Sequence, residues 1–329
     1  MLLAVQRNAL RWLSPPGGSA HLTIFTYHRV MAEPDPLLPD EFHARSFAAQ
    51  MSWIADYFRV LSLPDAVQTL AQGTLPARAA AITFDDGYAN NLEVALPILQ
   101  RHRLTATVFI AVDAVERGIM WNDMVIEALR RAPAEIDLSK FGVGKLSMPD
   151  AMARAAAVER VLSQLKYLPL AERWQRAEEL YRSIAGSTPP RLMMTREGVR
   201  KLADAGIDVG AHTVNHPILK GMTDDDARRE IVGSARWVAD VTGRTPRSFA
   251  YPNGRPGLDY ETRHAVMTRE AGFELAVTTQ WGYATRASST YELPRIAPWD
   301  RTRHRFWARM MKTHLGSQST PATMAASGY

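Results

Sequence analysis

Apolar and polar positions divide much of this chain into short strand-like runs separated by longer helical segments. The runs are rich in β-branched and aromatic residues, and the segments between them place apolar residues at helical spacing. Because strands that alternate with helices tend to pair in parallel, this order predicts an α/β fold with a parallel sheet or barrel. The expected strands lie at residues 21–30, 58–63, 81–84, 106–112, 207–211, 249–251, 276–279 and 293–296, and the expected helices at 41–57, 64–72, 90–102, 195–205 and 223–242.

Residues 121–190 depart from this alternation. They are rich in Ala, Arg, Glu and Leu and contain no convincing strand, while residues 151–168 and 170–184 carry helical periodicity. We expect a helical insertion beside the mouth of the site, which either grips a substrate, lipid carrier or partner or only buttresses the barrel. The expected divisions are an N-terminal segment (1–20), a barrel (21–120 and 191–312), the helical insertion (121–190) and a disordered tail (313–329).

The composition is that of a globular protein with a full hydrophobic core, since 46% of the 329 residues are hydrophobic. The formal net charge of +5 is a mild basic excess that specifies no partner. No basic cluster is interleaved with aromatic residues, so nucleic acid is not an expected partner. Because cysteine is absent, any metal site must use histidine and carboxylate ligands.

The first residues form too short an apolar run for export or membrane insertion. Only five residues precede Gln6 and Arg7, which predicts neither a secretion signal nor a membrane span and favours a cytoplasmic location. Apolar residues at partly helical spacing beside Arg7 and Arg11 also fit a short interfacial helix in peripheral contact with a membrane. An ordinary docking helix fits equally well.

A pair of acids ends the central strand-like run. Residues 81–84 are apolar and β-prone, and they stop at Asp85, Asp86 and Gly87. The carboxyl ends of parallel strands carry the sites of α/β proteins, so both acids are expected beside a cleft. Because successive residues leaving a strand face different ways, one carboxylate can bind a metal while its neighbour stays free as a base. Taken alone, the segment also fits a solvated turn.

Two histidines follow another strand-like run, residues 207–211. His212 and His216 are four residues apart, but Pro217 disfavours α-helical geometry at His216, so a strand-end loop fits better than a helix face. An acid from one strand end and two imidazoles from another form the two-His, one-carboxylate set of hydrolytic metal sites. Two unrelated surface histidines are the alternative.

These two segments resemble the first two motifs of a known family. Residues 83–87 (TFDDG) and 212–216 (HTVNH) are similar in sequence, order and separation to motifs of the NodB-homology polysaccharide deacetylases, carbohydrate esterase family four. The style is closest to exopolysaccharide deacetylases that act on poly-N-acetylglucosamine. The resemblance covers residues 22–110 and 195–297, and it implies a distorted or incomplete (β/α) barrel that carries the helical insertion.

The resemblance also implies roles for the residues of both motifs. Asp86, His212 and His216 would bind a divalent metal, with zinc expected and iron, cobalt or nickel compatible with the same ligands. Asp85 would act as the general base that removes a proton from water.

Three further roles rest on the resemblance alone. A Tyr-His segment precedes the Asp-Asp motif in the exopolysaccharide enzymes, so His28 would protonate the leaving amine; the usual late Leu-x-His element is missing here. Tyr251 would offer its backbone N–H to the oxyanion, although Ala250 stands where the more familiar third motif has an arginine. Arg295 would pair with the base carboxylate, and a surface salt bridge is the competing interpretation.

The implied activity is release of acetate from N-acetylated sugars of a polysaccharide or glycan intermediate, as in exopolysaccharide biosynthesis. The nearest alternative is another amide or ester hydrolase, an O-deacetylase or a deformylase, acting on a glycolipid or sugar nucleotide. A non-haem iron oxygenase shares the ligand set but normally has an all-β pattern. A non-catalytic saccharide-binding module is the third alternative, and the intact acid at Asp85 argues against it. The sequence predicts no oligomeric state.

Overall fold

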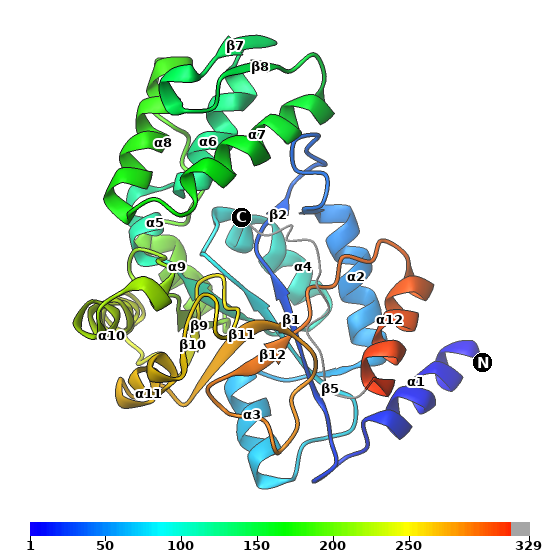
Figure 1. Ribbon diagram of the computed structural model, residues 1–329. Coiled ribbons are helices and arrows are strands. Elements are labelled where there is room, and N and C mark those ends of the chain that lie inside the picture. Colours follow the sequence, from blue (N-terminus) through cyan, green and yellow to red (C-terminus); the bar gives the residue numbers. More distant parts are fainter. Residues whose placement is uncertain (317–329) are drawn as a thin grey trace.

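The computed structural model describes residues 1–316, and residues 317–329 lie outside the described part. The predicted disordered tail at 313–329 therefore falls largely outside it. Residues 313–315, the first of the predicted tail, are helical because they belong to α12 (Arg303–Leu315). Figure 1 shows strands at the centre of the molecule, helices around them and a further group of helices above.

The central strands are all parallel and form a curved sheet (Figure 1). They pair in the order β1-β5-β6-β9-β10-β11-β12, with β4 beside β5. The end strands meet where the Ile296 N–H donates to Ile24 of β1 (2.8 Å) and the Thr26 N–H donates to Ile296 (2.9 Å). The predicted α/β class is confirmed as a nearly closed parallel seven-stranded barrel. The strands are β1 (Leu22–Tyr27), β4 (Arg59–Val60), β5 (Ala79–Phe84), β6 (Thr107–Ile110), β9 (Asp208–Ala211), β10 (Ser248–Ala250), β11 (Leu275–Trp281) and β12 (Leu293–Arg295).

Strand β5 is buried along its whole length because each of its faces meets a different core. Ile82 and Phe84 pack in the core shared with the outer helices, whereas Ala79 and Ala81 join a second core that α3 (Leu63–Gln72) helps to close. Side chains of a strand alternate between faces, so burial on both faces requires a continuous apolar run. Polar chemistry is therefore confined to the residues that follow the strand.

Helices cover the outside of the barrel, and side-chain caps mark where two of them begin. Thr195 accepts the Gly198 N–H at the start of α9 (3.1 Å), and Thr223 accepts the Asp226 N–H at the start of α10 (3.2 Å). The acids that open α10 lie in its first turn, where their negative charges interact favourably with the helix dipole. The outer elements are α2 (Ala44–Tyr57), η1 (Asn91–Ala95, a π-helix), α4 (Leu96–Arg101), α9 (Arg196–Asp204), η3 (Leu219–Gly221), α10 (Asp224–Thr242) and α11 (Thr262–Glu270), with a short parallel pair β2 (Val30–Met31) and β3 (Phe42–His43).

The strand predicted at residues 58–63 is shorter in the structure. Only β4 pairs with β5 there. Ser62 accepts the Asp65 N–H and caps α3, and Leu63 already belongs to that helix. A capping serine followed by Pro64 thus ends the extended segment earlier than its apolar pattern indicates.

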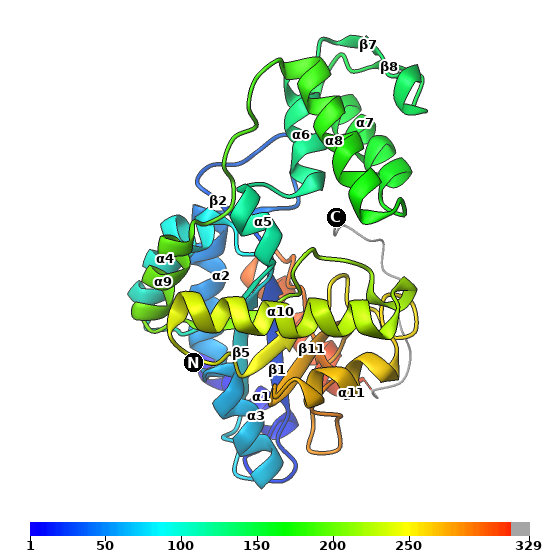
Figure 2. The ribbon, with the colours of Figure 1, turned by 90° about the vertical axis from the view of Figure 1, so that its left-hand side faces the viewer.

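The insertion has a hydrophobic core of its own and lies above the barrel (Figure 1, Figure 2). It is mainly helical, as predicted, but it also contains an antiparallel pair of strands that the sequence pattern did not predict. Each of these strands has three residues, too few to show a period of two. The domain boundaries proposed from the sequence stay predictions. The elements of this region are α5 (Val112–Arg117), α6 (Trp121–Arg131), β7 (Glu135–Asp137), η2 (Ser139–Phe141), β8 (Lys145–Ser147), α7 (Ala151–Leu165) and α8 (Leu170–Ala185).

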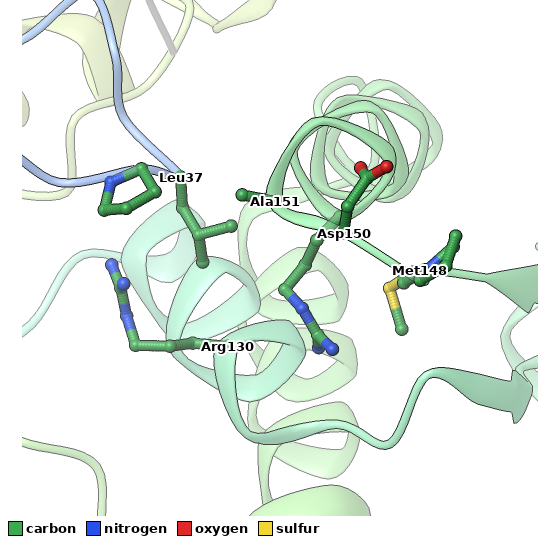
Figure 3. A pocket seen from close by; sticks show the side chains of 8 residues that line it. Leu37, Arg130, Met148, Asp150 and Ala151 are labelled. Atoms are coloured by element: carbon green, nitrogen blue, oxygen red, sulfur yellow. The ribbon is translucent and has the colours of Figure 1, made fainter.

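A loop of the barrel reaches up to the insertion. Leu37 and Leu38 join the core of the insertion, and Arg130 of α6 donates two hydrogen bonds to Asp35 (3.0 and 2.6 Å). Figure 3 shows a pocket at this junction, where Leu37 and Arg130 lie near Asp150 at the start of α7. The predicted site residues do not line it.

Helix α1 (Leu2–Leu13) lies beside α12 (Figure 1). Leu10 is buried against the core, whereas Leu2, Val5 and Trp12 are exposed and follow one another at helical spacing. The helix therefore docks by one face and presents an apolar stripe to solvent. Within residues 1–316, no helix is both long enough and apolar enough to span a membrane.

Candidate metal centre

Three predicted ligands meet at the carboxyl ends of the barrel strands. Asp86 follows β5, while His212 and His216 lie in the loop after β9. One ligand atom from each lies within 4.8 Å of the others, and Asp86 and His212 are buried. The strand-end loop expected for the histidines is confirmed, because residues 212–216 are not helical.

The loops hold these ligands in an uncommon backbone conformation. Asp86 (φ 75°), Thr213 (φ 63°) and His216 (φ 51°) all lie in the left-handed region. Each such conformation lowers stability by about 1–3 kcal/mol and persists only where the surrounding structure holds it. Such positions are frequent at functional sites. Part of the fixing comes from Thr213, whose hydroxyl accepts the His216 N–H (3.1 Å).

Gly87 is required directly after the ligand Asp86. Its φ is +90°, and a Cβ there would lie 2.9 Å from Ile110 Cδ1. Any side chain would be strained in this conformation and would collide with the neighbouring strand β6. The Asp-Asp-Gly segment is therefore a tightly packed loop rather than the solvated turn that was its alternative reading.

The donor atoms fit a divalent metal. Asp86 Oδ1 is buried without a hydrogen-bond partner in the described residues and lies 3.6 Å from His212 Nε2 and 3.5 Å from His216 Nε2. The His212 Nδ1–H donates to the Ala250 carbonyl (2.7 Å), which leaves the Nε2 lone pair directed at the site. A carboxylate oxygen and two imidazole nitrogens with no other partner are a typical set of metal ligands.

Burial sets the protonation states of the ligands. Burial, together with the charges of Asp85, Asp123 and Glu41, raises the pKa of Asp86 to about 7, against the opposing charge of His28. Burial lowers the pKa of His212 to about 4, and burial with the neighbouring His212 lowers the pKa of His216 well below its ordinary value. Both imidazoles are thus neutral near pH 7, and the carboxylate is the group that exchanges a proton for the metal.

Metal affinity is expected to rise with pH up to about 7 and then to level off. Because the pKa of Asp86 is raised to about 7, the metal-free site holds a proton below that pH, and binding must release it. Zinc titrations against a competing chelator between about pH 5.5 and about pH 7.5 test this. An affinity that does not change across this interval contradicts the assignment of Asp86 as a ligand.

Asp85, the neighbouring acid, is held by Arg295 rather than by the histidines. Two parallel hydrogen bonds of 2.7 Å join the guanidinium to the two carboxylate oxygens, and both side chains are buried. Arg295 also donates to the Thr278 carbonyl (2.8 Å), so its own position is fixed. Burial alone would raise the pKa of Asp85, but the charge and hydrogen bonds of Arg295 outweigh it and hold that pKa below its usual range. The contact predicted for Arg295 is present, and its burial excludes a surface salt bridge.

His28 lies at the same site. It directly follows β1, and its Nε2 is 3.9 Å from Asp85 Oδ2. Its side chain is 40% exposed, compared with 13% for His216, whereas Asp86 and His212 are buried. The structure therefore places His28 beside Asp85 and partly in contact with solvent.

Tyr251 does not have the predicted geometry. Its backbone N–H donates to the Val277 carbonyl (3.3 Å), so it continues the ladder between β10 and β11 instead of facing the site. Its ring is buried and stacks on Tyr260 (3.9 Å between centroids), and its hydroxyl donates to the Tyr291 carbonyl. The motif resemblance did not show that strand pairing extends to this residue, and the oxyanion role is therefore not supported for this N–H.

Glu230 of α10 supports the histidine loop and was missed in the sequence. Its carboxylate accepts the backbone N–H groups of Val214 and Asn215 (2.8 Å each) and the Asn215 side-chain amide (2.6 Å). These bonds hold the loop between the two histidine ligands. No local signal could have revealed this role, because Glu230 lies on a helix of ordinary amphipathic pattern.

Replacement of Glu230 by alanine is expected to lower metal affinity by about 10–100-fold although Glu230 is not a ligand. Glu230→Gln should retain part of the affinity, since the amide oxygen can still accept from the loop. Asp240→Ala, an exposed acid on the same helix, is the matched control. Equal affinities of the alanine variant and the wild type would contradict the positioning role.

A buried ion pair lies next to the site. Arg29 donates to Asp123 Oδ1 of α6 (2.7 Å), and the other oxygen of Asp123 has no hydrogen-bond partner in the described residues. Trp121, at the start of the same helix, is buried. The insertion therefore begins in direct contact with the barrel loop that carries His28.

Comparison with known proteins agrees with this geometry. The sequence model of the family described as polysaccharide deacetylase matches residues 72–276, more than half of the chain. The Bacillus subtilis (strain 168) protein YxkH is 22% identical over 279 residues, 84% of this chain and 71% of YxkH. The Streptococcus pyogenes deacetylase PplD, solved with acetate, has a TM-score of 0.60 at 18% identity and covers 90% of this chain and 99% of its own. IcaB from Ammonifex degensii has a TM-score of 0.58 at 16% identity, over 92% of this chain and 99% of its own. With the fold, the metal ligands and the matched sequence in agreement, the chain belongs to the polysaccharide deacetylase family.

Proposed function

We propose that the protein is a metal-dependent N-deacetylase that releases acetate from N-acetylated sugars of a polysaccharide or glycan intermediate. The observation that carries this proposal is the different surroundings of two adjacent acids. One carboxylate oxygen of Asp86 has no hydrogen-bond partner in the described residues and lies near two imidazoles, whereas Asp85 is held ionised by Arg295. This arrangement suits hydrolysis at a metal by water that a separate base deprotonates.

Asp86, His212 and His216 would hold the metal, with zinc favoured and iron, cobalt or nickel accepted by the same donors. When bound, the ion would polarise the acetamide carbonyl and lower the pKa of water at the site. The α/β barrel argues against the oxygenase alternative, which normally uses an all-β fold.

Asp85 is proposed to receive the proton of the attacking water. Its low pKa keeps it ionised at neutral pH, and the two bonds from Arg295 fix the plane of the carboxylate. An ionised carboxylate has about four lone-pair sites, so it can accept a further proton while bound to Arg295. Its weak basicity means that the transfer depends on water that the site has already made more acidic.

His28 is proposed to protonate the leaving amine. It lies close to Asp85 and is the exposed member of the site, so it can reach both the base and a bound substrate. Imidazole is a common general acid in enzymes.

Matched substrates test the proposed bond specificity. Purified protein loaded with zinc is given N-acetyl, O-acetyl and N-formyl derivatives of the same glucosamine oligomer, and acetate or formate release is measured. Acetate from the N-acetyl compound at the highest kcat/KM is the expected result. A higher kcat/KM for the ester or the formamide would replace the proposal by the alternative hydrolase acting on a glycolipid or sugar nucleotide.

We also propose that the protein works in the cytoplasm in peripheral contact with a membrane, in the assembly of an exopolysaccharide. The exposed stripe of Leu2, Val5 and Trp12 supports the contact, and α1 and the adjacent α12 contain no acidic residue. The full chain is expected to float with vesicles of anionic lipid, and Trp12→Ser with Val5→Ser should abolish this. Flotation of both proteins alike, or of neither, contradicts it.

A further inference from the structure

Arg173 of α8 is a buried cation without an acidic partner in the described residues. Its side chain is almost fully buried, with 6% of the residue exposed. One N–H donates to the Lys166 carbonyl (3.2 Å), and the guanidinium lies over the Trp121 ring at 4.8 Å. Arg29 and Arg295, the other buried arginines described, each pair with a carboxylate at 2.7 Å. Arg173 is therefore the exception among them.

Burying a charge without a partner of opposite sign destabilises the folded state, so such a charge points to a further role. Burial lowers the pKa of Arg173 to about 10, yet the group stays charged at neutral pH. The Lys166 carbonyl ends α7, and the helix dipole there stabilises a cation in part. A carbonyl and an aromatic face occupy few of the five guanidinium donors, and neither supplies a negative charge.

A second cation, Lys166, is a neighbour of Arg173, which bonds its backbone carbonyl. Burial is the largest cause that lowers the pKa of Lys166; the charges of Arg255 and Arg173 lower it further, and the charge of Asp259 opposes them. Trp121, whose ring lies under the Arg173 guanidinium, is two residues before Asp123. Asp123 pairs with Arg29, which directly follows His28. Figure 1 and Figure 2 show the turn between α7 and α8 above the barrel end that carries the site. The acid in this group, Asp259, already bonds Arg255 (3.2 Å).

We propose that Arg173, assisted by Lys166, binds a phosphate or carboxylate group of the substrate, so that the N-acetylated glycan on which this enzyme acts is anionic. The proposal rests on the proposed deacetylase function and specifies its substrate class. Stacking on Trp121 orients the guanidinium in advance, and the open donors form paired hydrogen bonds with an oxyanion. The insertion thus selects the substrate, while the barrel carries out the reaction.

Kinetics with charged and neutral sugars test the selectivity. The zinc-loaded enzyme is given N-acetylglucosamine 1-phosphate, N-acetylmuramic acid and the methyl glycoside of N-acetylglucosamine. The first carries a phosphate, the second a carboxylate and the third no charged group. We expect at least one charged sugar to exceed the neutral one by tenfold or more in kcat/KM. Arg173→Gln should remove this preference through KM, and Arg173→Lys should keep part of it. Arg176→Gln, an exposed position on the same helix, should change neither.

The same variants distinguish binding from a structural role. If Arg173 only caps α7, its loss should lower turnover of charged and neutral sugars by the same factor, which overturns the proposal. If Arg173→Gln does not fold, Lys166→Gln is the second variant, because it alters a partly exposed side chain. It should lower the kcat/KM preference for charged sugars by a smaller factor. An unchanged preference in Lys166→Gln would then count against the site.

A binding measurement separates this proposal from the deacetylase function. Calorimetry of metal-free protein with N-acetylglucosamine 1-phosphate needs no turnover, and removal of the metal prevents phosphate from binding there. Binding to the wild type that weakens tenfold or more in Arg173→Gln supports the anion site even if acetate is never released. Equal binding to both proteins overturns the anion site and leaves the deacetylase proposal standing.

Discussion

Asp85→Asn is expected to lower kcat by about 10²–10⁴-fold while zinc binds with nearly wild-type affinity. Asparagine has the shape of the acid and can still accept a hydrogen bond from Arg295, but it cannot take a proton from water. Asp85 is not one of the three candidate metal ligands, so the variant should still bind metal. Acetate release and zinc content are measured on the same preparations.

The loss of the buried ion pair needs its own control. Breaking such a pair leaves an uncompensated charge, so Asp85→Asn is also expected to unfold at lower temperature than the wild type. Asp300→Asn breaks another Asp–Arg pair, between the buried Asp300 and the partly buried Arg309, that includes no candidate ligand. An activity of Asp85→Asn close to that of the Asp300 variant would show that Asp85 is structural and not a base.

Asp86→Asn is expected to abolish metal binding and, above about pH 7, to make the metal-free protein more stable than the metal-free wild type. The pKa of Asp86 is raised to about 7 in the folded state, above its value in the unfolded chain. Between these two pKa values the folded state binds more protons than the unfolded chain, so the free energy of unfolding falls as pH rises. The stabilising contribution of protonated Asp86 is fully lost above the folded pKa. A neutral amide removes this penalty.

Thermal unfolding of both metal-free proteins across this pH range tests the stability change, and a chelator titration tests the affinity. His304→Ala, which removes an exposed histidine, is the control for non-specific zinc binding. If Asp86→Asn bound zinc normally, the carboxylate would not be a ligand. If the metal-free variant were less stable at high pH, the charge on Asp86 would have another partner.

The strand-end argument explains why much of the site could be predicted. Strands buried on both faces are mainly apolar, so the charged Asp85 and the imidazole of His212 mark where β5 and β9 end. Parallel strands bring those ends to one rim of the barrel. The motif resemblance then assigned the proposed ligand role to Asp86 and the proposed base role to Asp85, which strand alternation alone could not do.

The remainder depends on contacts that no local pattern encodes. Glu230 of α10 bonds the histidine loop, and Arg173 stacks on Trp121 across two helices of the insertion. Asp86 has a left-handed conformation beside the tightly packed Gly87, and this packing involves residues from β6 that no local pattern indicates. Tyr251 was assigned from a motif, whereas its N–H is determined by pairing with β11.

The most direct test of the central claim is acetate release from N-acetylglucosamine oligomers, with anionic N-acetylated sugars alongside, by the full chain stripped of metal and then reloaded with zinc. The account predicts no release from the stripped protein, recovery on reloading, and no recovery in Asp85→Ala that has bound the same amount of zinc. Acetate released without metal, or none from any N-acetylated sugar by protein with the metal held by Asp86, His212 and His216, would contradict it.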